Sequence, residues 1–145
     1  MDNKTNSHIV GESLAKLYFE LQGYFVYTNS SGKAEFDLVL SKDGLLYSAE
    51  VKTVSVEKTS IKGTYFDVQL KSVRSNTTEN TIHNFDNSFI DYLCIVNITN
   101  NTILVLEASG IKVHGSIRIY SDRFKNILAG AEVGSSHDLE NHSNT

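Results

Sequence analysis

Two β-rich runs flank the dipeptide Asp43-Gly44, and this arrangement constrains the fold more than any other feature of the chain. Asp-Gly is a preferred pair for a two-residue type I′ turn between antiparallel strands. The sequence therefore predicts a β-hairpin over residues 36–52, with Lys42 opposite Leu45. Because a two-residue turn fixes the register, all other cross-strand pairs of the hairpin follow from this one.

The predicted register brings two carboxylates together. Asp37 lies opposite Glu50 in a non-hydrogen-bonded pair, in which Cα atoms are roughly 4.5 Å apart. Lys52 is two residues beyond Glu50 and shares its face of the sheet. Like charges at this separation destabilise a hairpin unless a cation neutralises them or one carboxylate takes up a proton. A hard divalent cation meets that need, because it prefers oxygen ligands.

The two faces of the hairpin differ in polarity. The face that carries the carboxylates is half polar, and we expect it to form the floor of a cleft. The opposite face is apolar, and we expect it to pack on a helix. The residues predicted on that apolar face are Phe36, Leu38, Leu40, Leu45, Tyr47, Ala49 and Val51.

A helix is predicted before the hairpin, from a cap at Ser7 to about Gln22, with Gly23 as its stop. Its apolar positions recur with the helical period and are Val10, Leu14, Leu17, Tyr18 and Leu21. Glu12 falls on the opposite side of the helix. Periodicity alone therefore assigns Glu12 to solvent, with Lys16 as its partner one turn later.

Further strands are predicted at residues 24–28, 64–70, 89–98, 102–108 and 116–120, and a second helix at residues 122–129, capped by Ser121. The run 89–98 is apolar enough for a buried central strand. Residues 71–87 are polar and are expected to form a long functional or mobile loop. Residues 1–132 should form one mixed α/β or α+β domain around a central sheet, and residues 133–145 a disordered polar tail.

Composition limits the classes of protein that fit. The chain has 145 residues, 40% of them hydrophobic and 21% charged, as expected for one globular domain. Cys94 is the one cysteine, so no disulfide forms within the chain, and we expect a buried thiol in a reducing compartment. We see no signal peptide and no apolar run of membrane-spanning length, and we expect a cytoplasmic protein.

The net charge of −4 does not indicate a nucleic-acid-binding protein, but the charge is uneven. Residues 52–74 hold five basic and two acidic side chains. This stretch is either a solvated surface or a surface that contacts phosphates. The candidate nucleic-acid-binding residues are Lys58, Lys62, Gln69, Lys71 and Arg74.

The hairpin residues suggest a reaction. Asp37 and Glu50 can hold Mg²⁺, with Mn²⁺ as a substitute and the carbonyl of Val51 as a further ligand. Lys52 can orient or activate a water, or stabilise negative charge on a phosphate. Phosphodiester hydrolysis needs all of these features together. The alternative is that Glu50 and Lys52 form an ordinary salt-bridged strand face.

Asp37 with Glu50-Val51-Lys52 resembles the PD-(D/E)xK nuclease superfamily, which has the restriction-endonuclease-like fold: a central mixed sheet flanked by helices. Gly11-Glu12, Gly23-Tyr24, Ser31-Gly32 and Phe36-Asp37 resemble archaeal Holliday-junction resolvases. The segments 89–93 and 103–107 are similar to small homing endonucleases of group I introns. Phe36 stands where the motif has proline.

The resemblance implies roles for individual residues. Asp37 and Glu50 would bind metal, Lys52 would be the catalytic lysine, and Glu12 would be a helix carboxylate that binds metal directly or through water. It implies a metal-dependent DNA endonuclease, of homing or restriction type, that acts as a homodimer or homotetramer. A Holliday-junction resolvase and a nuclease-like module that binds nucleic acid without cutting are the alternatives.

Overall fold

The computed structural model describes residues 3–29, 36–70, 72–75, 80–83, 90–112 and 115–131. Its one α-helix in these ranges is α1 (Asn3–Leu21), and no described helix is long and apolar enough to cross a membrane. The strands are β1 (Phe25–Thr28), β2 (Leu38–Lys42), β3 (Leu45–Val54), β4 (Lys58–Ser60), β5 (Gly63–Gln69), β6 (Ser72–Ser75), β7 (Asn80–His83), β8 (Tyr92–Asn97), β9 (Thr102–Glu107), β10 (Ser116–Tyr120) and β11 (Lys125–Asn126). Short 3-10 turns are η2 (Ala108–Gly110), η3 (Ser121–Arg123) and η4 (Ile127–Ala131).

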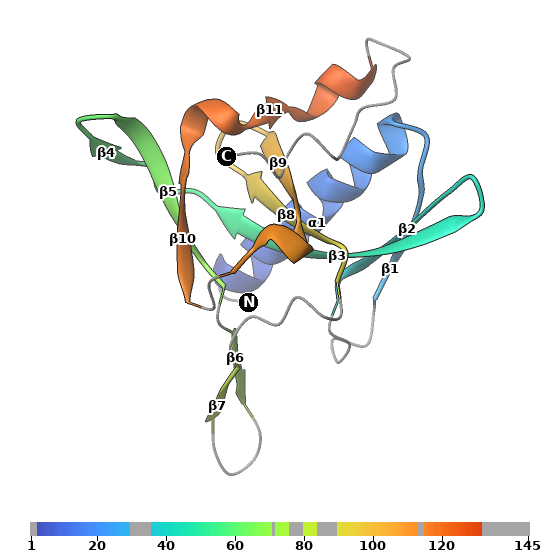
Figure 1. The fold of residues 1–145 in the computed structure, drawn as a ribbon, viewed down its shortest axis with the longest axis horizontal. Coiled ribbons are helices and arrows are strands. Elements are labelled where there is room, and N and C mark those ends of the chain that lie inside the picture. Colours follow the sequence, from blue (N-terminus) through green and yellow to red (C-terminus); the bar gives the residue numbers. More distant parts are fainter. Residues whose placement is uncertain are drawn as a thin grey trace.

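The centre of the molecule is a six-stranded mixed sheet in the order β1-β2-β3-β8-β9-β11. β3 and β8 run parallel, and the other neighbours are antiparallel. Helix α1 crosses one face of this sheet, and a three-stranded sheet, β10-β5-β4, stands against the other face (Figure 1). This arrangement confirms the predicted α+β class, although a small sheet, and not a helix, covers the second face.

The central sheet separates two apolar cores. One core joins α1 to the sheet through Phe19, Leu38 and Cys94, and the other joins the second sheet through Phe66 and Leu93. Strands β8 and β9 contribute alternate side chains to both cores, which explains why β8 reads as a continuous apolar run. The predicted buried central strand and the buried free thiol of Cys94 are both confirmed.

The hairpin of β2 and β3 has the predicted turn. Asp43 and Gly44 both have positive φ angles, of 54° and 79°, as a type I′ turn requires. Lys42 pairs with Leu45, and the register continues without a shift to Leu38 opposite Ala49. The Asp43-Gly44 turn therefore sets the register of residues 38–49, and with it the side chains of this hairpin that face the helix.

The alternation of β2 breaks just before its first residue. Leu38 packs in the core under α1, whereas Phe36 packs in the other core, so these two residues lie on opposite faces of the sheet. Residues two apart in a regular strand share a face. The prediction that Phe36 belongs to the helix-facing side is therefore wrong, and the cause is an irregularity at Asp37.

Helix α1 begins earlier than predicted, at Asn3 and not after Ser7, and it ends at Leu21 with Gly23 at a φ of 94°. Its buried face is made by Gly11, Ala15, Tyr18 and Phe19. In the predicted stripe, Val10 and Leu17 are instead 45% and 38% exposed. The small residues face the sheet because the helix approaches it closely there.

One strand was not predicted, and two predicted segments differ from the structure. Residues 58–60 form β4, which pairs with β5, and the polar segment 71–87 contains the paired strands β6 and β7, which project from the body of the molecule (Figure 1). The helix predicted at residues 122–129 is absent: η3, β11 and η4 occupy this stretch. Pairing of Lys125 with Ile103 on β9 replaces helical hydrogen bonds. The predicted tail, residues 133–145, lies outside the described residues.

The close approach of α1 to β3 yields a stability prediction. A Cβ atom on Gly11 would lie 2.0 Å from Cγ2 of Thr53, so Gly11→Ala must displace the helix, the strand or the Thr53 side chain. Overpacking of this kind costs about 1–3 kcal/mol, more than the gain of about 1 kcal/mol that alanine offers in a helix. Chemical denaturation should show a net loss of stability.

The double variant Gly11→Ala/Thr53→Ser lacks the methyl group that would clash, and it should recover most of the loss. Ser13→Ala, on the exposed side of the same helix, is the matched control. A Gly11→Ala protein as stable as the wild type would contradict the proposed close contact.

Candidate active site

Asp37 lies where β2 separates from β3. Its N–H donates to the carbonyl of Ala49 (2.9 Å), and its own carbonyl accepts from the N–H of Asn29 (3.0 Å). The Oδ2 atom of Asp37 accepts a hydrogen bond from the N–H of Val51 at 2.7 Å. In a regular ladder, the N–H of Val51 would donate to a backbone carbonyl of the neighbouring strand. Here the carboxylate of Asp37 takes the place of that carbonyl.

This geometry changes the predicted relation between Asp37 and Glu50. The ladder ends at Leu38 and Ala49, so Asp37 and Glu50 do not form the expected cross-strand pair. Asp37 is instead bonded to the amide of Val51, the residue between Glu50 and Lys52. The carboxylate thus remains attached to the Glu50-Val51-Lys52 segment, through the backbone.

Glu50 and Lys52 lie on the face of the central sheet that meets the second sheet, since Leu93, the partner of Glu50 on β8, packs in that core. The Nζ atom of Lys52 is 3.3 Å from Oε1 of Glu50, and both side chains are mostly buried, at 19% and 23% exposure. Partial burial strengthens this ion pair relative to one on an open surface.

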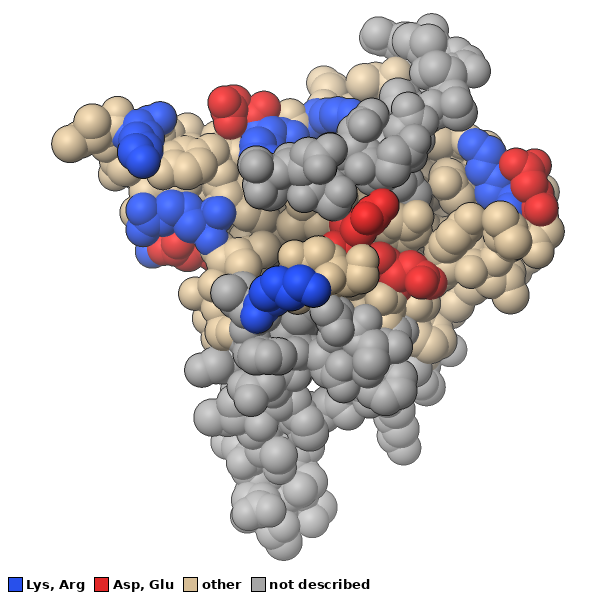
Figure 2. Space-filling model, viewed as in Figure 1, with Lys and Arg blue, Asp and Glu red and all other residues tan. Residues whose placement is uncertain are grey.

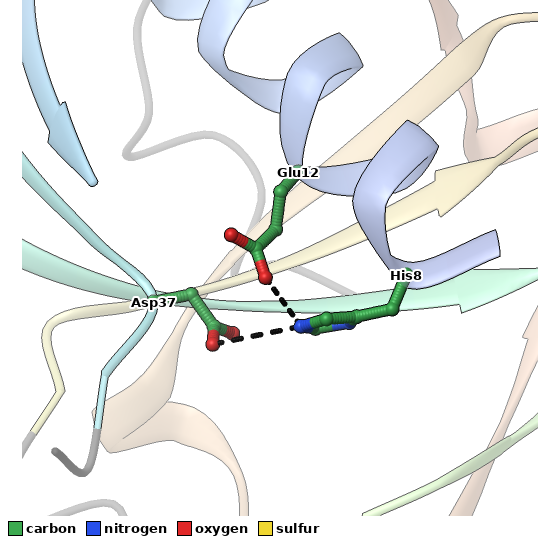
Figure 3. Close-up of side chains that lie close together, drawn as sticks. All are labelled: His8, Glu12 and Asp37. Atoms are coloured by element: carbon green, nitrogen blue, oxygen red, sulfur yellow. Dashed lines mark ion pairs between the residues drawn. The ribbon is translucent and has the colours of Figure 1, made fainter. Parts of the chain in front are cut away.

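Glu12 reaches Asp37 from α1. Figure 3 shows Glu12 and His8 pointing from adjacent turns of the helix toward Asp37 at the start of β2. The Nε2 atom of His8 contacts Oε2 of Glu12 and lies 3.9 Å from Oδ1 of Asp37. Donor atoms of these three side chains all lie within 4.8 Å of one another, and no other described group of three such residues is this close.

The electrostatics of this cluster are unfavourable without a cation. Burial raises the pKa of Glu12 above its usual range, and the negative charge of Asp37 raises it further, while His8 partly opposes both effects. The folded protein therefore resists a second negative charge beside Asp37. A bound divalent cation would relieve that repulsion.

The sequence-predicted residues fall into two groups joined by one hydrogen bond. Glu12 and Asp37 lie together at the helix, and Glu50 and Lys52 lie together on β3. Glu12 does not have the solvated position that periodicity assigned to it, and its partner one turn away is His8, not Lys16. The catalytic and metal-binding roles of these residues remain predictions.

The predicted nucleic-acid-binding residues lie apart from this cluster, mostly on the second sheet. Figure 2 shows basic side chains gathered over β4, β5 and β10. Lys58 donates to Oδ2 of Asp67 (3.0 Å), a contact that raises the pKa of Lys58 and lowers that of Asp67. Lys62 and Gln69 are exposed. Lys71 and the side chain of Arg74 lie outside the described part of the chain.

Sequence reasoning missed two contributors to these surfaces. Arg118 on β10 lies 3.9 Å above the ring of Tyr65 and 3.6 Å from Asp67, so it adds positive charge beside Lys58. His8 is the other. The available signal for His8 was its spacing of four residues before Glu12, which places both side chains on one helix face.

The fold is that of an endonuclease-like α+β protein, and the family that the sequence matches makes the chain a nuclease. Residues 2–126 match the PD-(D/E)XK endonuclease family, and the chain belongs to that family. The solved structure of a bacterial homing endonuclease, I-Ssp6803I, has the same fold, with a TM-score of 0.68 over 83% of this chain and 80% of that chain at 16% identity. No protein of curated function matches.

The raised pKa of Glu12 yields a prediction for Glu12→Gln. A carboxyl group whose pKa is raised on folding favours the folded state at low pH and disfavours it as the pH rises through that raised pKa. Gln keeps the shape of the side chain without its charge, so Glu12→Gln should be more stable than the wild type at pH 7 without metal. Denaturation at several pH values measures the difference.

The difference should vanish below the usual pKa of a glutamate, where Glu12 is protonated in both states. Glu20→Gln, at an exposed position of the same helix, is the control. A Glu12→Gln protein less stable than wild type at pH 7 would mean that the contact with His8 outweighs burial and repulsion.

Proposed function

We propose that this member of the family is a DNA endonuclease of homing or restriction type that hydrolyses phosphodiester bonds with Mg²⁺, for which Mn²⁺ can substitute. The observation that carries this proposal is the hydrogen bond from the Val51 N–H to Asp37, because it ties the first carboxylate of the motif to the Glu50-Val51-Lys52 segment. We infer that residues 1–132 act as one nuclease domain.

The donor groups fit a hard divalent ion. Asp37, Glu50 and Glu12 offer carboxylate oxygens, the ligands that Mg²⁺ prefers. The N–H and carbonyl of one strand residue point toward the same neighbouring strand. Since the N–H of Val51 points at Asp37, its carbonyl is directed to the same side and would be a further ligand. When bound, the ion supplies positive charge to the phosphate and lowers the pKa of a bound water.

The protein groups have separate tasks in this proposal. Asp37 is held in place by the Val51 amide, so its Oδ1 atom keeps its orientation without a cost at the moment of reaction. Lys52 is oriented by Glu50 and is the group that orients the attacking water or stabilises charge on the scissile phosphate. Glu12 completes the negative charge that attracts the ion.

DNA would be contacted by the basic side chains at residues 58–74. Lys62 lies in the turn between β4 and β5 and is exposed, and Lys58 shares Asp67 with Arg118. Phosphate contacts of this kind position a duplex without reading its sequence. Gln69 is exposed on β5 and has the side chain to read an adenine edge. We propose that Lys71 and Arg74 contact DNA as well.

We propose that the enzyme acts as a homodimer or homotetramer, since one small domain offers one active site and a double-strand break needs two. An exposed apolar strip supports this. Phe25 and Leu46 flank Ser41 across three strands, and both are exposed, at 71% and 69%, as is the adjacent Tyr27 at 59%. Large apolar side chains on one sheet face are typical of an association surface.

Lys52→Ala should lower cleavage of supercoiled plasmid by about 10²–10³-fold, the usual cost of losing one group that stabilises transition-state charge, with DNA binding retained. Asp37→Asn should also be inactive, although its amide oxygen can still accept from Val51. Lys125→Ala, on the exposed strand β11, is the control and should cut normally.

The products separate the candidate functions. Linear plasmid that forms without an accumulating nicked species indicates paired active sites and supports a homing or restriction enzyme. Paired nicks confined to a four-way junction indicate a resolvase. If wild-type protein cuts none of these DNAs with Mg²⁺ or Mn²⁺, or if Lys52→Ala cuts normally, the proposed function is wrong.

The basic surface yields a separate prediction for binding. Lys62→Ala should weaken DNA affinity about equally for all sequences and reduce the slope of log K against log[salt] by about 0.9, the value for one phosphate contact. Fluorescence anisotropy across a salt series measures the slope. Lys125→Ala is again the control, and an unchanged slope for Lys62→Ala would place the DNA elsewhere.

A further inference from the structure

We propose that His8 is a direct ligand of the active-site metal through Nε2, and that it raises the affinity of the site for first-row transition metals more than its affinity for Mg²⁺. This inference rests on the proposed metal-dependent function and concerns the chemistry of the same site. It adds a nitrogen donor to a set that the motif itself builds from oxygen alone.

His8 projects from α1 toward the same place as Glu12 and Asp37. Residues four apart on a helix lie one above the other on the same face, so His8 and Glu12 project together toward the start of β2 (Figure 3). The Nε2 atom of His8 contacts Glu12 and lies 3.9 Å from Oδ1 of Asp37. The Nε2 atom of His8 is thus close to the carboxylates of both Glu12 and Asp37, the two groups proposed to bind the metal.

The spacing of the donor atoms is the second argument. Ligand atoms around an ion with bonds of 2.0–2.1 Å lie about 3 Å apart when adjacent and about 4.2 Å apart when opposite. The donor atoms of His8, Glu12 and Asp37 all lie within 4.8 Å of one another. Small side-chain rotations therefore bring the three around one ion without any change in α1 or β2.

The surroundings leave His8 able to make this change. Its side chain is 47% exposed, so it can rotate, whereas Glu12 is 22% exposed and Asp37 is fixed by the Val51 amide. An ion that replaces the direct His8–Glu12 contact would keep both side chains near their present places. The three donor atoms are therefore already close enough to surround one ion after small shifts of the side chains.

Donor chemistry sets the expected metal. Mg²⁺ takes oxygen ligands and gains little from imidazole, whereas affinities of nitrogen-containing sites rise from Mn²⁺ through Co²⁺ and Ni²⁺. Loss of His8 should therefore affect Mn²⁺ and Co²⁺ far more than Mg²⁺. The role of His8 then differs from that of Glu12, whose loss should weaken binding of every divalent ion.

Electron spin echo measurements on the Mn²⁺-loaded protein test ligation directly, without an activity assay. Imidazole bound to Mn²⁺ gives ¹⁴N modulation. The wild type and His83→Ala should show it, and His8→Ala and His8→Gln should not. Titration followed by EPR should show Mn²⁺ affinity at least tenfold weaker in His8→Ala. Loss of a residue that only hydrogen-bonds to a metal ligand already lowers metal affinity by about 10–100-fold, and loss of a ligand should cost at least as much. Mg²⁺ affinity should change less than threefold.

The outcomes are distinguishable from failure of the proposed function. If ¹⁴N modulation persists in His8→Ala, or is absent from the wild type, while Asp37→Asn still abolishes Mn²⁺ binding and cleavage, then His8 is not a ligand and the proposed function stands. If Asp37→Asn changes neither metal binding nor cleavage, both the inference and the proposed function fail. Circular dichroism of each variant checks that it is folded.

Discussion

The hydrogen bond from the Val51 amide to the Asp37 carboxylate is the interaction on which the rest of this site depends. It forms because β2 leaves β3 at Asp37, so that a side-chain oxygen takes the place of a backbone carbonyl. The same irregularity sends Phe36 to the opposite core from Leu38. One local change therefore anchors the strand end in both cores and turns the carboxylate toward α1, while it stays attached to the segment that carries Glu50 and Lys52.

The two carboxylates near α1 destabilise the metal-free protein, because they repel each other and are partly buried. Asp37 and Glu12 lie together and are both mostly buried, and burial with mutual repulsion raises the pKa of Glu12. The protein tolerates this because Gly11, the residue before Glu12, lets α1 approach β3 closely and the apolar core that α1 shares with β3 fixes both elements. Local conflict at a functional site, supported by a consistent core, is a common pattern in enzymes.

Much of the fold could be predicted from sequence, because particular residues have strong local preferences. Asp43-Gly44 specified the turn and register of the hairpin, and the apolar run 89–98 specified the central strand. The buried face of α1 was harder to predict. Large apolar residues such as Val10 suggest burial, but Val10 is exposed, and the small residues Gly11 and Ala15 are buried instead. The polar strands β6 and β7 carry no hydrophobic alternation. In the site, the motif residues were predictable, but the register alone could not reveal the break at Asp37, and the approach of His8 depends on how α1 crosses the sheet.

The most direct test is a crystal structure of the protein soaked in Mn²⁺, with anomalous scattering to locate the ion. We expect one peak within about 2.0–2.3 Å of an Asp37 oxygen, with a Glu50 oxygen bound to the same ion and the Val51 amide still donating to Asp37. An ion bound elsewhere, with Asp37 outside its coordination, would contradict the claim that this carboxylate and the Glu50-Val51-Lys52 segment form one metal site.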